Sequence, residues 1–427
     1  AIWAEDVRKK SLDAFKKSGF PGRKEAYRFT NIEKFLSVAD WQAPKYVIKN
    51  EQVASALESQ SLYDNLVVFI NGTLSKEYSR QNSPMNDLVI GPIAQELEGE
   101  EKAWKDFAIF KDDELTHLHH AFLGEGVVIR AKKNAKTSLK ILSFITDDNI
   151  FSHPTILIKT EKHAELTVFE ECYSLNEKLY AQQLYSLIQV EAGAKVEHIQ
   201  LVHENNTANY LNTTEARIQK DGTYRNITLH LGAAMSRKNL AIELLESGAH
   251  AESFALYGLK GKQHSDISTQ ILHKAADTTS AQIAKGILAD ESRGVFTGKI
   301  HIFQEAQRVN SSQLNKNLLL STKAQAHSQP QLEIFADDVK CSHGSTTGQL
   351  QDDELFYFQS RGIPADKARA LLAHAFGNEI LMKIENKQMR EEISYDLSNT
   401  ENWIVVFNKL YDLLGTKPTT PLADKMI

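Results

Sequence analysis

Two side chains that could do chemistry stand close together late in the chain: the thiol of Cys341 and the imidazole of His343. Residues two apart on a β-strand point to the same face of a sheet, so on a strand these groups would lie side by side. If both faced outward, a sulfur and an imidazole nitrogen would form half of an iron or zinc site, to be completed by a second protein. A nucleophile with its base is another interpretation. The residues alone favour a third, a buried cysteine and a polar histidine near a turn.

The other potential ligands are weaker candidates. The only other cysteine, Cys172, lies in an alternating stretch and is expected to pack as a small hydrophobe. The run HLHH at 117–120 offers three imidazoles, which we expect in a surface turn rather than in a metal site. A further group of histidines lies in or beside expected strands, as solvent-facing or hydrogen-bonded structural residues: His198, His203, His230, His264, His273 and His301.

Motifs of nucleotide chemistry are missing from the sequence. There is no G-x-x-x-x-G-K-[ST] loop, no G-x-G-x-x-G, no G-x-S-x-G and no C-x-x-C. The chain is therefore not expected to hydrolyse ATP. Two cysteines are also too few to hold an iron–sulfur cluster, which usually needs four thiolates, so we expect no cofactor stably bound by this chain alone.

The composition limits the possible partners and compartments. A net charge of −6 argues against a nucleic-acid partner, because nucleic-acid-binding domains usually carry a basic face. No run of eighteen apolar residues is present, so we expect no membrane span. The first residues lack the apolar core of a signal peptide, and two cysteines make no disulfide framework. Together these features predict a cytoplasmic protein.

The elements that must position Cys341 and His343 change in character along the chain. Residues 1–118 mix expected helices with a strand and an Asn-Gly turn, which predicts a hairpin. Residues 119–347 alternate apolar and polar side chains and lack long helical patterns, which predicts a strand-rich core. Residues 348–427 return to helical spacing and predict a helical cap that closes the end of the core. Its helices are expected to start near Asp352 and to cover 366–385 and 402–414.

Small-residue turns recur through the core at spacings of about 27–29 residues and later of about 14–18 residues. A coil of about 28 residues with two long sides explains both spacings, because every turn then lies at a corner. Stacked coils bury their inward apolar side chains in one continuous core. The pattern favours a parallel β-helix over the alternative, a large antiparallel sandwich or barrel.

Several stretches resemble one family. The segment QPQLEIFADDVKCSHGSTTGQLQDDELFYFQSRGIP at 329–364 is closely similar to the end of the core in the SufB/SufD family of the Suf iron–sulfur cluster assembly system. Residues 19–35, 225–240 and 286–324 are also similar to that family. The resemblance implies a right-handed parallel β-helix core flanked by an N-terminal α/β region and a C-terminal helical region. It also implies a non-ATPase scaffold subunit rather than an enzyme, and two cysteines favour the SufD branch over the cysteine-richer SufB branch.

The resemblance implies partners as well. The ATPase SufC would dock on the helical region, at about 350–385. The paralogue SufB would pair through the β-helix, with a homodimer in its place when the chain is isolated. A transient iron or nascent iron–sulfur cluster would form near that junction. Our hypothesis makes His343 the preferred ligand there, with Cys341 either its neighbour at the site or a residue that packs the strand. The candidate SufC contacts, whose apolar members are alternatively the core of the cap, are Leu355, Phe356, Tyr357, Phe358 and Arg361.

Two other functions fit a β-helix. Enzymes that act on polysaccharides place acidic residues in a groove, and Asp337 and Asp338 stand near Cys341. Such enzymes are usually secreted, which the expected cytoplasmic location argues against. A left-handed β-helix acyltransferase would need a hexapeptide repeat, and none is visible.

Overall fold

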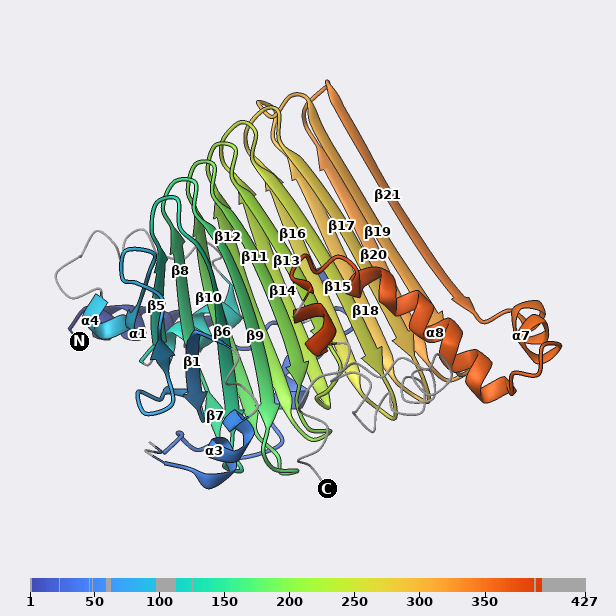
Figure 1. Cartoon of the computed structure of the whole chain (residues 1–427), viewed down its shortest axis with the longest axis horizontal. Coiled ribbons are helices and arrows are strands. Elements are labelled where there is room, and N and C mark those ends of the chain that lie inside the picture. Colours follow the sequence, from blue (N-terminus) through green and yellow to red (C-terminus); the bar gives the residue numbers. More distant parts are fainter. Residues whose placement is uncertain are drawn as a thin grey trace.

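The structure, a computed structural model, describes residues 2–22, 24–45, 47, 49–58, 63–96, 113–124, 126–387 and 389–393. Its centre is a parallel β-solenoid of about eight turns, with helices towards both ends of the chain (Figure 1). The predicted mainly β fold with a parallel β-helix core is therefore confirmed, and the antiparallel alternative is wrong. The helix expected over 402–414 lies outside the described residues.

Two long sheets form the walls of the β-helix. Sheet I has eleven strands, which run from β2 and β1 at the N-terminal end to β21 at the other end. Its strands are β1 (Asn65–Ile70), β2 (Thr73–Leu74), β3 (Arg80–Gln81), β6 (Lys136–Ile145), β9 (Glu165–Ser174), β11 (Lys195–His203), β13 (Thr223–His230), β15 (His250–Leu259), β17 (Thr279–Leu288), β19 (Val309–Leu319) and β21 (Val339–Gln349).

Sheet II has ten strands, which run from β4 to β20 along the opposite wall. Its strands are β4 (Leu88–Pro92), β5 (Gly126–Ala131), β7 (Phe151–Ser152), β8 (Thr155–Thr160), β10 (Ala181–Val190), β12 (Asn209–Ile218), β14 (Met235–Leu244), β16 (His264–His273), β18 (Arg293–Ile302) and β20 (Gln325–Ile334). From β8 onward each coil contributes one strand to each sheet, and adjacent strands of a sheet pair in parallel. Aligned residues of successive coils therefore form rows that run along the helix axis and face the same side of the wall.

One corner of each coil needs a left-handed backbone residue. These residues recur every 27 to 31 positions, with φ between 54° and 76°: Asn134, His163, Gly193, Asp221, Gly248, Asp277 and Arg308. The backbone N–H of each donates to a carbonyl of the next coil, at 2.6 to 3.3 Å, so one ladder of hydrogen bonds joins the corners. Gly, Asn and Asp favour such corners because they adopt positive φ with little strain. This ladder explains the predicted turn spacing.

The N-terminal region packs on the first coils and on the outer face of sheet II. The hairpin of β1 and β2 turns through Asn71 and Gly72, both with positive φ, as predicted. Residues after α1 cross the outer face of sheet II, where the ring of Tyr27 lies 4.0 Å from the Arg237 guanidinium. The N-terminal helices are α1 (Ile2–Ser18), η1 (Glu25–Tyr27), α2 (Ile32–Leu36), α3 (Glu51–Glu58), α4 (Ile93–Glu96) and α6 (Glu114–Ala121).

Of the described C-terminal helices, the second packs on the side of the β-helix, and the last part of the expected cap, 394–427, lies outside the described residues. Helix α7 (Asp352–Gln359) is followed by Gly362, whose φ of 81° turns the chain back. Helix α8 (Ala365–Leu381) then runs along the outer face of sheet I, against β15 and β17 (Figure 1). Its apolar side joins a buried cluster with Leu256 and Ile287, so the side of the sheet, rather than the end of the coil, receives this helix.

Residues 365–393, which we call the C-terminal strap, are held to sheet I by charges as well as by apolar packing. Each of three sheet cations contacts one carboxylate of the strap, and the three sites are spread from β17 back to β6. The pairs are Lys285 with Glu379, Arg225 with Glu385, and Lys140 with Glu392. The strap thus links the last coils to the first.

Candidate functional site

The last coil of the β-helix, which we call the open coil, presents two strand edges that have no partner strand among the described residues. Strand β21 ends sheet I and pairs with β19, while β20 ends sheet II and pairs with β18. Side chains of both end strands are half-buried or exposed, whereas most of those in β18 are buried. Within the described part of the chain, neither α7 nor α8 makes an extensive contact with β20 or β21, so the backbone edge of the last coil is a candidate site for another chain.

Cys341 and His343 lie together on this open coil, within β21 rather than in a turn. Cys341 is aligned with Ser311 and His343 with Gln313, and both of these β19 residues are buried in the interior of the β-helix. The thiol and the imidazole therefore belong to the inward-facing rows. Their predicted placement on one face is confirmed, whereas the outward orientation assumed for the half-site is wrong.

The two groups differ in their surroundings. Cys341 is half-buried against an apolar cluster that includes Ile302 and Val309, and burial raises the pKa of its thiol. A backbone hydrogen bond from Ser311 lowers that pKa in part. The side chain of His343 is exposed at the open end. Among the described residues no cluster of three or more His, Cys, Asp or Glu side chains could hold a metal ion, so these two are at most half of a site.

Polar side chains line the interior directly behind the site. Across the coil, Ser345 Oγ lies 2.8 Å from Ser328 Oγ and so joins β21 to β20. One coil deeper, Ser311 Oγ lies 2.6 Å from Ser280 Oγ, which lies 2.9 Å from His273 Nε2. The interior of the last coils is thus hydrogen-bonded rather than purely apolar. Alternating strand patterns could not reveal this, because they separate two faces without saying which polar side chains are enclosed.

The five candidate docking residues divide into two groups on α7 and the turn after it. Leu355 is 8% exposed, and Phe358 is half-buried. Phe356 and Tyr357 are 69% and 55% exposed, and the Arg361 guanidinium lies 4.6 Å from the Tyr357 ring. Helix α7 therefore displays two exposed aromatic side chains, with the Arg361 cation in the turn that follows it, whereas Leu355 is buried.

The histidine run at 117–120 is not a surface turn, contrary to the prediction. It lies in α6, where His119 and His120 are buried because the helix packs on sheet II. His119 Nε2 lies 2.9 Å from Thr155 Oγ1, and its Nδ1 lies 3.2 Å from the carbonyl oxygen of Gln183. Burial lowers the pKa of His120 to about 4, so these rings are neutral structural groups.

A second polar cluster lies deep in the β-helix and was not foreseen from the sequence. Lys238 is buried, and its Nζ donates to Asn212 and Thr214 at 2.5 Å each. Burial lowers the pKa of Lys238 to about 7. Cys172 is also buried here, 3.7 Å from the Tyr210 hydroxyl, in agreement with its predicted structural role. All these side chains are enclosed, which distinguishes them from the open coil.

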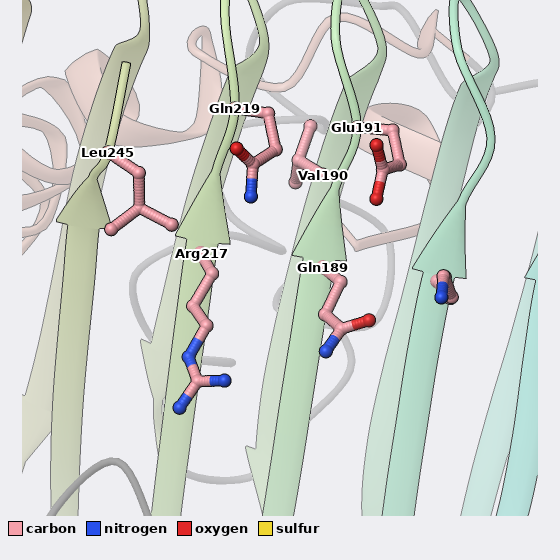
Figure 2. Close-up of a pocket in the computed structure, with 7 residues that line it drawn as sticks. Gln189, Val190, Glu191, Arg217, Gln219 and Leu245 are labelled. Atoms are coloured by element: carbon pink, nitrogen blue, oxygen red, sulfur yellow. The ribbon is translucent and has the colours of Figure 1, made fainter. Parts of the chain in front are cut away.

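A surface pocket of about 270 Å³ lies on the outer face of sheet II, several strands from the open coil. Figure 2 shows the side chains that line it. It is lined by Lys159, Gln189, Val190, Glu191, Arg217, Gln219 and Leu245. Strands β14, β16 and β18 separate its β8–β12 walls from β20. Its cations are accompanied by Glu191, and Arg217 also approaches Glu243 at 3.8 Å, so the pocket holds no concentrated charge for a ligand.

Within the described part of the chain, no helix has both the length and the apolar character required to cross a bilayer.

Comparisons with known proteins agree on one family. Residues 143–376 match the family model described as SUF system FeS cluster assembly, SufBD core domain. An iron–sulfur cluster assembly SufBD family protein of Synechocystis sp. is 30% identical over 388 residues, which span 85% of this chain and 83% of the relative. The iron–sulfur cluster assembly protein SufD of Escherichia coli is 26% identical over 394 residues, 90% of this chain and 89% of the relative. The chloroplastic protein ABCI7 of Arabidopsis thaliana is 30% identical over 243 residues, 56% of this chain and 51% of the relative.

Proposed function

The chain belongs to the SufBD family of iron–sulfur cluster assembly proteins, and from that premise we propose that it is a scaffold subunit of the SufD branch, not an enzyme. The match to a SufD over most of both chains and the presence of only two cysteines support the branch. Both cysteines are free thiols, which supports a location in the reducing cytoplasm.

The partner at the open coil is SufB in this proposal. Strands β20 and β21 present unpaired backbone groups, and a second β-helix of the same family would continue both sheets. This pairing would cover Cys341 and His343 and bring the partner's side chains to them. When SufB is absent, a second copy of this chain would meet the same edges as a homodimer.

The partner at α7 is the ATPase SufC. Exposed aromatic side chains and arginine are the residue types that contribute most to protein interfaces, and Phe356, Tyr357 and Arg361 stand together here. Leu355 and Phe358 would support the helix from behind. The C-terminal strap begins with α8 and follows α7 after a short turn. Force applied to α7 would therefore be transmitted through the strap to sheet I.

The observation that carries the proposal is that two potential ligands, Cys341 and His343, lie side by side on the inward-facing rows of the open coil. His343 would bind incoming iron as neutral imidazole, whereas Cys341 must first lose a proton that its partly buried position retains. Two ligands do not complete a site, so the remainder would come from SufB. Iron or a nascent cluster is then transient cargo of the complex rather than a resident cofactor of this chain.

Co-purification tests both partner assignments. Tagged chain produced with SufB and SufC should retain both, and the complex should contain iron and acid-labile sulfide after reconstitution. Replacing Phe356 and Tyr357 together by serine should remove SufC and leave SufB bound. Met382→Ser is the matched control, because Met382 is 59% exposed directly after the neighbouring helix α8, and this variant should retain both partners. A chain that recovers neither partner would contradict the scaffold proposal.

A further inference from the structure

Gln313 lies one coil behind His343 in a chain of side-chain amides. Its Nε2 donates to Gln282 Oε1 at 2.7 Å, and Gln282 Nε2 donates to Thr269 Oγ1 at 2.5 Å. These two bonds fix the direction of both amides. The remaining oxygen, Gln313 Oε1, is buried and has no hydrogen-bond partner in the described part of the chain.

A buried acceptor without a donor is uncommon in folded proteins, because folding removes its bonds to water without replacing them. The opposite wall makes space for this amide, since a Cβ built on Gly298 would come within 2.0 Å of Gln313 Nε2 and 2.7 Å of Phe296 Cζ. The position of Gln313 thus depends on the absence of a side chain at residue 298.

The neighbours of Gln313 on the same inward face already have partners. Ser311 shares its hydrogen bond with Ser280, and Asn315 Nδ2 donates to the Tyr257 hydroxyl at 3.2 Å. The residue aligned with Gln313 in the next strand is His343, which faces the same side and carries a ring N–H. Its side chain is exposed and unconstrained by packing, so it is free to turn towards the amide.

We propose that Gln313 is a positioning residue for His343: its Oε1 accepts the N–H of the imidazole and so selects one tautomer. The other ring nitrogen then directs its lone pair to the open end, where cargo iron would arrive. Acceptors behind a metal-binding histidine commonly fix its tautomer and orientation in this way. This inference rests on the proposed ligand role of His343 and names the residue that prepares it.

The test is the tautomer of His343 in the full-length chain, read from ¹⁵N–¹H spectra of protein labelled at histidine, with the resonance assigned by its loss in His343→Ala. The wild-type ring should show a single tautomer with a hydrogen-bonded N–H. Gln313→Met keeps the volume but removes the acceptor, and should give the mixture of tautomers seen in a free side chain. Gln313→Glu keeps an acceptor and should restore the single tautomer.

Two further variants separate positioning from packing. Gly298→Ala displaces the amide without changing its chemistry and should act like Gln313→Met. Asn317→Leu removes another buried amide of β19, two rows from His343, and should leave the tautomer unchanged. If the wild-type ring already shows the free mixture, or if Asn317→Leu changes it as much as Gln313→Met does, the inference is wrong.

Assembly kinetics supply a second readout. With SufB, SufC, ATP, ferrous iron and a sulfide source, Gln313→Met should lower the initial rate of cluster formation about tenfold while both partners remain bound. If His343→Ala assembles clusters at the wild-type rate, the ligand role fails, yet the tautomer measurement still decides the role of Gln313. If Gln313→Met changes the tautomer of His343 but not the initial rate of cluster formation, the proposed contribution of Gln313 to assembly is refuted.

Discussion

Lys140 offers the sharpest test of how the C-terminal strap is attached. Its side chain is fully buried on the outer face of sheet I, with Nζ 2.9 Å from Glu171 Oε2 and 2.5 Å from Glu392 Oε1. The rings of Tyr63 and Phe169 also face the ammonium group, at 4.7 and 4.6 Å. Burial lowers the pKa of Lys140, but the two carboxylates more than offset this and leave it above its ordinary value.

The loss in the free energy of unfolding depends on which buried charge each substitution leaves without a partner. Lys140→Met keeps the apolar stem but leaves Glu171, which is fully buried, without its cation, so the free energy of unfolding should fall by about 3–5 kcal/mol. Lys140→Met with Glu171→Gln removes both charges and should recover about 2 kcal/mol of that loss. Glu392→Gln leaves the Lys140–Glu171 pair in place and should cost about 1–2 kcal/mol, because Glu392 is partly exposed.

Urea unfolding followed by circular dichroism measures these differences, and hydrogen exchange locates them. Glu392→Gln should accelerate exchange in residues 365–393 while β9 to β19 keep their protection. The reasoning is refuted if Lys140→Met changes the free energy of unfolding by less than about 1 kcal/mol, or if the double variant is less stable than the single one.

Two further predictions concern the buried charges and histidines. Burial lowers the pKa of His120 and His273 to about 4 and of His230 to about 3, so each ring stays neutral in the folded protein. The free energy of unfolding therefore decreases as the pH falls from about 6.5 towards these values, because the unfolded chain binds the protons more tightly. At pH 5 each should cost about 2 kcal/mol. Burial likewise lowers the pKa of His203 and His264 to about 4 and of His153 to about 3, whereas it raises the pKa of Glu204 to about 7 with the opposite sign. Urea unfolding should therefore show a net loss of more than about 5 kcal/mol between pH 8 and pH 5, and a flat profile would contradict the neutral rings. Arg237→Met should lower the free energy of unfolding by about 3–5 kcal/mol, because it leaves the carboxylate of Asp266 buried without a cation. A loss below about 1 kcal/mol would refute this prediction.

The sequence predicted the coil well because two local signals repeat in every turn of the β-helix. Alternation marked the strands, and the recurring corner residues, such as Asp221 and Gly248, marked the places where a left-handed backbone is needed. The same period of two placed Cys341 and His343 on one face of their strand. These predictions succeed because each depends on neighbours within a few residues.

The path of the C-terminal strap and the contents of the interior could not be predicted in this way. The helical spacing of 366–385 shows that an apolar side must be covered, but Leu256 and Ile287, which cover it, lie about 100 residues earlier. Likewise, alternation does not reveal that Gln313 is enclosed or that its oxygen lacks a donor. The missing half of the metal site lies beyond any single-chain argument, because its ligands would belong to a partner.

The most direct test of the account is the iron and acid-labile sulfide bound by the reconstituted complex with SufB and SufC when His343 is replaced by alanine. His327→Ala is the matched control, since this half-exposed histidine lies on β20 of the same coil and stacks on Phe29 at 4.2 Å. The account predicts that His343→Ala retains both partners but lowers bound iron and sulfide about tenfold, while His327→Ala leaves them near the wild-type level. Full loading of the His343→Ala complex would contradict the claim that this open coil supplies part of the cluster site.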